Sequence, residues 1–186
     1  MIKYTHFRFC PKCGSRNIEA FKRNGINCGD CAYLYFHNCA SSTMGIIEAA
    51  NGIILVKRGS PPKRGYYDLP GGFVDYGESF EAALTREVKE ELNIVVVDLR
   101  YLASFPNIYR YKKVTYFTTD AVFICRSANV QGMHPMEEIS EIAIIKPEKI
   151  DVEAVAFESS RQALRKYLSQ NLKCLKCSKV PKMPKI

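Results

Sequence analysis

The sequence contains no tryptophan and no apolar stretch long enough to cross a lipid bilayer. Residues 1–9 are interrupted by polar side chains and lead directly into cysteines, so they do not resemble a signal peptide. These absences exclude a membrane-spanning helix and make the cytoplasm the expected location. They also argue against a disulfide framework, because cysteines in a chain without an export signal are expected to stay reduced.

The charge is distributed unevenly along the 186 residues, although 47% hydrophobic and 25% charged residues are typical of a globular protein. The net charge is +4 over residues 1–40, −4 over residues 41–160 and +8 over residues 161–186, which contain no aspartate or glutamate. A lysine-rich end can attract RNA, a membrane surface or an acidic partner, but a solvated tail explains the same charge. The length suffices for one substantial core and a small appendage.

Four of the cysteines form two C-x2-C pairs, Cys10 with Cys13 and Cys28 with Cys31, separated by fourteen residues. This spacing predicts a tetrahedral four-cysteine zinc site in which each pair supplies a tight turn. About thirty residues cannot fold on apolar burial alone, so a bound Zn²⁺ would supply the missing stability. Four thiolates leave no open coordination position, which favours a structural over a catalytic site. We therefore expect residues 1–40 to form a small zinc ribbon.

The basic residues near these cysteines allow two interpretations of the ribbon. It can pack on its neighbour, or it can contact nucleic acid through its cations, which are Lys12, Arg16, Lys22 and Arg23. A third C-x2-C pair, Cys174 and Cys177, has no companion pair nearby. It falls in residues 173–186, a basic segment that we expect to be a flexible tail.

The segment that follows Thr85 places three carboxylates close together. On a helix, Glu87, Glu90 and Glu91 occupy positions i, i+3 and i+4, so their side chains project from one face. Mutual repulsion would raise each pKa unless a cation lay among them, and oxygen ligands suit a hard divalent ion, Mg²⁺ or Mn²⁺. An apolar stripe would anchor the helix through Leu84, Val88 and Leu92. A solvated acidic face is the alternative to a metal site.

The spacing around this helix resembles the Nudix box of the Nudix hydrolases. Gly72 is followed after five residues by Glu78, and after seven more by Arg-Glu-x-x-Glu-Glu-Leu-x-Ile, which begins at Arg86. The late glycine of the family is Asn93 here, and asparagine is the best substitute for glycine in the left-handed conformation that ends a helix. Ser79 is the expected N-cap. By the same resemblance, Arg86 would pair with Glu78 and orient the catalytic loop rather than contact the substrate.

The resemblance also implies a set of metal ligands. Glu87, Glu91 and the carbonyl of Gly71 would hold Mg²⁺ or Mn²⁺, which is needed because pyrophosphate and bare carboxylates repel one another. Glu90 and Glu138 would be further metal ligands or the base that activates water. An acidic loop without a catalytic role is the alternative for Glu138.

The fold class follows from periodicity together with the resemblance. Periodicity indicates an α+β protein, and the resemblance implies the Nudix α/β/α sandwich with a mixed sheet over residues 41–172. An Asn51-Gly52 turn predicts a hairpin of residues 45–50 and 53–57. Further elements are expected in order, namely strands at 94–97, 99–105, 114–125 and 142–145 and a helix from Val155 to Asn171. Residues 40–43 are expected to be a small-residue linker.

A four-cysteine ribbon followed by a Nudix box resembles the NADH pyrophosphatase group, or NAD diphosphatases. In that group a Ser-Gln-Pro-Trp-Pro-Phe-Pro-Gln-Ser-like segment follows the box and marks dinucleotide preference. Residues 104–111 share a serine and a proline with it but lack the tryptophan. The expected substrate is a nucleoside diphosphate linked to another moiety, either NADH or NAD or an ADP-ribose-like compound, with capped RNA as a further candidate. Four residues there could stack on a base or meet phosphate, namely Phe105, Tyr109, Arg110 and Tyr111.

A function of another class stays open, that of a catalytically inactive Nudix-fold module that binds nucleic acid or regulates a partner. The intact glutamate set argues against it, because a dead site has no need of three mutually repelling carboxylates. The expected partner is a nucleotide-type small molecule, and no membrane partner is expected. A homodimer is common among Nudix hydrolases of this kind, and nucleic acid is a further candidate partner.

Overall fold

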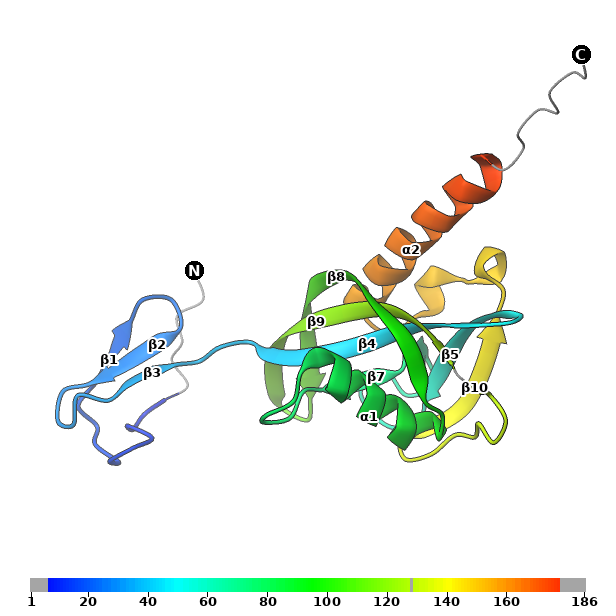
Figure 1. Cartoon of the computed structure of the whole chain (residues 1–186). Helices are drawn as coiled ribbons and strands as arrows, with labels where there is room; N and C mark the ends of the chain where they lie inside the picture. Colours follow the sequence, from blue (N-terminus) through cyan, green and yellow to red (C-terminus); the bar gives the residue numbers. More distant parts are fainter. Residues whose placement is uncertain (1–6, 128, 178–186) are drawn as a thin grey trace, which may run out of the picture. The chain divides into compact units, whose positions relative to one another are not determined.

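The computed structural model describes residues 7–127 and 129–177, with side chains described up to residue 171. The chain divides into two compact units, Met1–Cys39 and Ala40–Ile186 (Figure 1). The second unit begins directly with a long strand, β4 (Ala40–Ala49). The prediction of a linker at residues 40–43 is therefore wrong, because this segment pairs with β7 (Gly71–Phe73) on one side and β9 (Val114–Ser127) on the other.

The first unit is a small antiparallel sheet in the order β1 (Ile18–Phe21), β2 (Gly25–Cys28) and β3 (Leu34–Phe36). Its buried apolar side chains within the described residues are Cys10, Ile26 and Cys28. Three short strands with so little apolar burial are marginal without a covalent or metal cross-link. A metal ion or a cross-link at the cysteines would supply the stability that this unit lacks.

The second unit contains a mixed seven-stranded sheet, which confirms the predicted fold class (Figure 1). The main order is β10 (Ile139–Ile145), β5 (Gly52–Arg58), β4, β9 and β8 (Val96–Tyr111), while β6 (Tyr67–Asp68) pairs with β5 and β7 pairs with β4. The pairing of β4 with β9 is parallel and the other pairings are antiparallel. The predicted hairpin is present, with Ala49 opposite Gly52 across the Asn51 turn.

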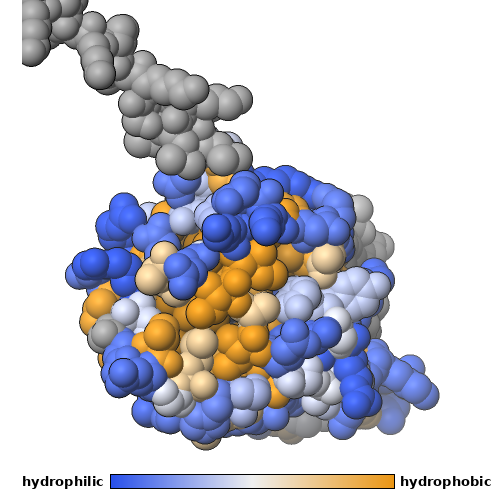
Figure 2. Space-filling view, turned by 90° about the vertical axis from the view of Figure 1, so that its right-hand side faces the viewer, coloured by the Kyte–Doolittle hydropathy of each residue, from blue (hydrophilic) through white to orange (hydrophobic). Residues whose placement is uncertain are grey.

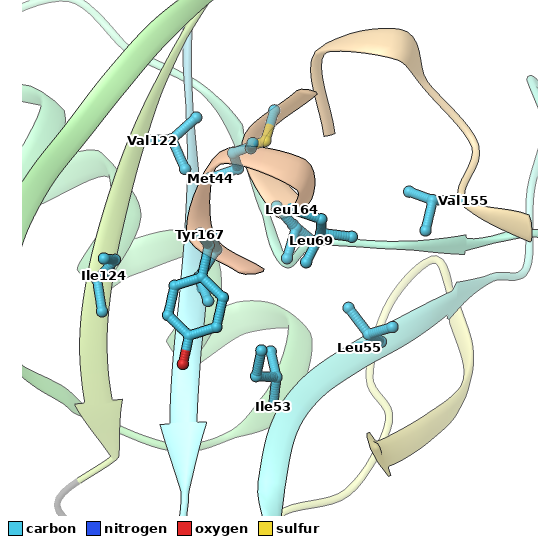
Figure 3. Packing of buried hydrophobic residues seen from close by; sticks show 11 residues of the cluster. Met44, Ile53, Leu55, Leu69, Val122, Ile124, Val155, Leu164 and Tyr167 are labelled. Carbon is cyan, nitrogen blue, oxygen red and sulfur yellow. The ribbon is translucent and has the colours of Figure 1, made fainter. Parts of the chain in front are cut away.

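One helix covers each face of this sheet. Consecutive residues of a strand face opposite sides, so Ile46 belongs to one buried cluster and Ile47 to the other. The first cluster packs under α2 (Glu158–Cys177) through Leu164 and Tyr167, which Figure 3 shows beside the strands. The second packs under α1 (Phe80–Leu92) and includes the predicted stripe Leu84, Val88 and Leu92. These layers form the expected α/β/α sandwich.

The ends of α1 are set by its caps. The Ser79 hydroxyl accepts a hydrogen bond from the backbone N–H of Ala82, as expected of an N-cap. Asn93 ends the helix in the left-handed conformation, at φ 56° and ψ 31°, and its N–H donates to the carbonyl of Lys89. Asparagine tolerates this conformation better than most residues. The departure from the family pattern at this position therefore preserves the helix end.

The last helix begins later and continues further than its periodicity predicts. Val155 forms a bridge with Tyr67, and the N–H of Ala156 donates to the carbonyl of Tyr67, so both residues are held extended against β6. Two short 3-10 helices precede them, η1 (Pro147–Lys149) and η2 (Val152–Ala154). α2 then runs to Cys177, so it includes part of the predicted tail. The Cys174 and Cys177 side chains and residues 178–186 lie outside the described part, and the predicted tail is untested there.

Several apolar side chains around the α2 core are only partly buried, including Ile145, Ile150 and Val152. Figure 2 shows hydrophobic side chains at the centre of the face it displays, surrounded by hydrophilic ones. None of the described helices combines the length and the apolar character that crossing a membrane requires.

Candidate active site and metal centre

A cavity of about 270 Å³ is lined by residues of α1, of the strands β4, β7, β8 and β9, of the start of α2 and of the loop before β10. Its wall is strongly acidic and includes Asp68, Glu87, Glu91, Asp120, Glu137 and Glu138. Among the described residues that line it, Arg58 is the one arginine or lysine. Such a cavity repels phosphate groups unless cations are present.

Two of the three predicted helix carboxylates face this cavity, and the glycine turn determines how they approach. The N–H of Gly71 donates to Glu91 Oε2 over 3.0 Å. A Cβ on Gly72 would lie 2.5 Å from the Glu87 carboxyl group, and one on Gly71 would lie 2.2 Å from the Thr43 carbonyl oxygen. Gly71 therefore excludes a side chain, because backbone atoms block it, whereas a side chain at Gly72 would displace the Glu87 carboxyl group. The side chain of Glu90 is 41% exposed and does not line the cavity.

Arg86 connects the loop before α1 to the helix through every nitrogen of its guanidinium group. Nε and Nη2 donate to the two carboxylate oxygens of Glu78 over 2.9 and 3.0 Å. Nη1 donates to Glu87 at 2.9 Å and to Glu90 at 3.0 Å, and Nη2 also donates to the carbonyl of Phe73. The predicted pairing of Arg86 with Glu78 is thus present. Arg86 does not line the cavity, which suits a positioning role.

Arg86→Lys should lower kcat/KM for a metal-dependent reaction in this cavity by about 10- to 100-fold. The reason is that a lysine ammonium group cannot make the bidentate contact with Glu78 and hold Glu87 in place at the same time. Steady-state kinetics at saturating Mg²⁺ would measure the change. The matched control is Arg165→Lys. Arg165 is an exposed residue of α2 that pairs with Glu158 of the same helix and with Glu153 of η2. The control should remain within about twofold of the wild type. Equal activity of both variants would show that the bidentate contact of Arg86 with Glu78 has no positioning role.

Burial disfavours the ionised form of several carboxylates that line the cavity and so raises their pKa values. Burial raises the pKa of Glu91 to about 8, against the lowering effect of the hydrogen bond from Gly71. Burial also raises the pKa of Glu87, opposed by Arg86, and raises that of Asp68 to about 6, opposed by the hydroxyl of Ser160. Carboxylates whose ionised form is disfavoured in this way are stabilised by a bound cation. The oxygen-rich donor set thus fits a hard divalent ion.

The structure brings some of the predicted substrate-contacting residues to the site and leaves others away from it. Tyr109 lines the cavity, and Tyr111 lines an adjoining one with Phe73. Phe105 instead packs against the α2 core. Arg110 is exposed and lines neither cavity, because alternate residues of β8 face opposite sides of the sheet.

Glu138 also lies where the resemblance implies, in the turn before β10 and in the cavity wall. The turn is held in place by the N–H of Gly59, which donates to the Glu138 carbonyl over 2.6 Å. Four further residues of the cavity wall were not expected from the sequence, namely Arg58, Asp68, Asn107 and Asp120. The one available signal was Asp120, an acidic residue within residues 114–125, where the other side chains are apolar, aromatic or hydroxyl-bearing.

The four N-terminal cysteines form the second candidate metal centre. Their sulfur atoms all lie within 4.8 Å of one another. The Cys10 and Cys31 sulfurs are 3.7 Å apart, as are those of Cys13 and Cys28. Tetrahedral zinc with Zn–S bonds of about 2.3 Å requires S···S separations of about 3.8 Å. The cysteines therefore fit a tetrahedral metal ion, and these separations are far too long for disulfide bonds.

Solved structures share this fold. A NUDIX hydrolase from Nitrosomonas europaea superposes with a TM-score of 0.72 at 23% identity, covering 90% of this chain and 93% of that chain. The NUDIX domain of NrtR from Shewanella oneidensis, solved with ADP ribose, gives a TM-score of 0.59 at 19% identity, covering 73% and 90%. At these identities the likeness concerns the fold.

Sequence comparison gives the family. The NAD-capped RNA hydrolases NudC of Vibrio atlanticus and Vibrio vulnificus are both 33% identical to this chain, over 123 and 124 residues. The matches cover 64% of this chain but 45% and 47% of those proteins, so the chain spans about half the length of the curated relatives it matches. The NUDIX domain model matches residues 40–167, which include β4, the acidic cavity and the first half of α2. The chain therefore belongs to the NUDIX domain family.

Proposed function

We propose that this protein hydrolyses a pyrophosphate bond in a nucleoside diphosphate linked to another moiety. The observation that carries the proposal is the cavity in which Glu87 and Glu91 of α1 meet the Gly71 turn within a NUDIX domain. A pyrophosphate group could not enter this acidic cavity alone, so the site needs divalent cations.

The residues that would hold Mg²⁺ or Mn²⁺ are Glu87, Glu91 and the Gly71 carbonyl, with Glu138 or Glu90 as a further ligand. Bound cations would neutralise the pyrophosphate oxygens and activate the attacking water. Glu138 is the stronger candidate for the general base, since it lines the cavity while Glu90 lies outside it and accepts from Arg86. In the reaction, the water oxygen bonds to one phosphorus, the bridging P–O bond breaks, and the base takes the water proton.

Arg58 would hold the substrate's phosphates from the cavity wall. Its guanidinium stacks on Phe157 at 5.1 Å from the ring centroid, and Nε donates to the carbonyl of Pro62 over 2.8 Å. Nη1 lies 3.6 Å from Asp68. These contacts fix the orientation of the guanidinium, which suits the planar recognition of phosphate oxygens.

The proposed substrate class is NADH or NAD and ADP-ribose-like compounds. The names of the sequence relatives and the ADP ribose in the Shewanella structure share one feature, a nucleoside attached to pyrophosphate. The Tyr109 and Phe73 rings, 5.9 Å apart and edge to face, offer an apolar surface to the nucleoside half. We also propose that the four-cysteine centre holds a structural Zn²⁺.

A substrate panel tests the proposal. The purified chain is incubated with Mg²⁺ or Mn²⁺ and NADH, NAD⁺, ADP-ribose, NAD-capped RNA or nucleoside triphosphates, and the products are separated by chromatography. We expect cleavage between the two phosphorus atoms, giving AMP from NADH, NAD⁺ or ADP-ribose, and no cleavage when EDTA is present. Salt-sensitive RNA binding without turnover of any compound would instead support an inactive binding module.

A further inference from the structure

Asp120 is a buried carboxylate with an asymmetric set of partners. It lies on β9, opposite Ser42 of the parallel strand β4, and is 3% exposed. Thr118 Oγ1 donates to its Oδ1 over 2.6 Å, and the Ser42 hydroxyl donates to the same oxygen. Both of these hydrogen bonds therefore end on Oδ1, and Oδ2 retains its capacity to accept.

This carboxylate also lines the acidic cavity. Arg58, the arginine in the same wall, lies 3.6 Å from Asp68 in an ion pair. A buried carboxylate is retained at the surface of a cavity only at an energetic cost, which hydrogen bonds to its ionised form reduce. The two hydroxyl donors fix the rotamer of Asp120 and hold the group as an oriented acceptor. Such an arrangement suits recognition of a donor on a bound molecule.

The strand register determines how far Asp120 lies from the Gly71 turn, where the pyrophosphate is proposed to bind. A nucleotide is long enough to reach from one to the other. Ser42 pairs with Phe73 of β7, and Met44 pairs with Gly71. Two residues along a strand span about 6.6 Å, and the two strand spacings from β7 across β4 to β9 add about 9.6 Å, so Asp120 lies roughly 12 Å from the Gly71 turn. The Phe73 and Tyr109 rings line the same cavity. A pyrophosphate bound at Gly71 would therefore place its attached nucleoside near Asp120.

We propose that Asp120 is a specificity-determining residue whose Oδ2 accepts a hydrogen bond from an N–H or O–H donor of the substrate's nucleoside half. This inference rests on the proposed function, since it assumes a nucleoside diphosphate in the cavity. The donor is either an amino group of the base or a ribose hydroxyl, which share the same chemistry. A substrate lacking that donor would leave a buried acceptor unpaired and would be rejected.

Asp120→Asn tests the proposal because it keeps the size of the side chain and replaces one oxygen with an amide donor. Binding is measured by calorimetry with non-hydrolysable α,β-methylene ADP-ribose and with its hypoxanthine and 3′-deoxyribose analogues. The wild type should bind one analogue about 10- to 100-fold more weakly than the parent compound. Asp120→Asn should bind the parent more weakly by a similar factor and should no longer distinguish it from that analogue. Which analogue is affected identifies the donor as base or ribose.

Asp98→Asn is the matched control, since it makes the same change at an exposed aspartate of β8 that pairs with Arg126 and does not line the cavity. It should retain the discrimination between parent and analogue. The proposal is overturned if Asp120→Asn discriminates as the wild type does, or if its main defect is a raised Mn²⁺ requirement, which would make Asp120 a metal ligand. Tight, discriminating binding without hydrolysis of ADP-ribose would support Asp120 recognition while refuting the proposed reaction.

Discussion

Glu91→Gln should abolish most of the proposed pyrophosphatase activity, lowering kcat by about a thousand-fold at saturating Mg²⁺. Its carboxylate lines the cavity, accepts a hydrogen bond from the Gly71 N–H and lies on the face of α1 that also bears Glu87. Glutamine keeps the shape and the contact with the Gly71 N–H but loses the negative charge that a cation requires. Initial rates of ADP-ribose cleavage measure the effect.

The control for this prediction is Glu81→Gln on the same helix. Glu81 is exposed in the first turn of α1 and does not line the cavity. It should retain activity within about twofold, with a loss of stability of about 0.3–1 kcal/mol from the helix dipole. The unfolding temperature of Glu91→Gln should match or exceed that of the wild type, because a neutral amide is easier to bury than a carboxylate. Undiminished turnover of Glu91→Gln would refute its role.

Removal of the proposed zinc ion should unfold the first unit and leave the second folded. Structural zinc binding contributes about 10–16 kcal/mol in small domains, more than three short strands can replace. We expect one zinc per chain by elemental analysis, and nearly none in Cys28→Ser. Hydrogen exchange should show amide protection lost in β1 and β2 but kept in α1 and β9.

Cys125→Ala serves as the control for zinc loss. Cys125 is buried on β9 in the second unit and takes no part in the four-cysteine cluster. This variant should keep its zinc and its amide protection in the first unit, even if it loses some stability from the small cavity. Unchanged protection in β1 and β2 of zinc-free Cys28→Ser would contradict a structural role for the metal.

Local spacing made part of the site predictable. Glu87 and Glu91 are four residues apart on one helix, so their shared face follows from helix geometry alone. The pairing of Arg86 with Glu78 followed from the family resemblance and is present in the structure. The cysteine cluster was also predictable, because each C-x2-C pair supplies two ligands within one turn.

The other parts of the site could not be predicted, because they depend on pairing between strands that are far apart in the sequence. Asp120 and Ser42 are 78 residues apart, and only the parallel register of β4 and β9 brings them together. Arg110 was a candidate because its residue type suits phosphate, but the phase of β8 turns it away from the cavity. The late start of α2 depends on the contact of Ala156 with Tyr67, which its own periodicity does not encode.

The measurement that tests the central proposal most directly is ADP-ribose hydrolysis in ¹⁸O-labelled water with Mg²⁺. Mass spectrometry of the products shows where the water oxygen goes. We expect AMP and ribose 5-phosphate as the products, with one ¹⁸O on the phosphate of one of them. Glu91→Gln should show no turnover. Products without ¹⁸O on phosphorus, or cleavage that persists in EDTA, would contradict hydrolysis of the pyrophosphate bond at the Glu87 and Glu91 cavity.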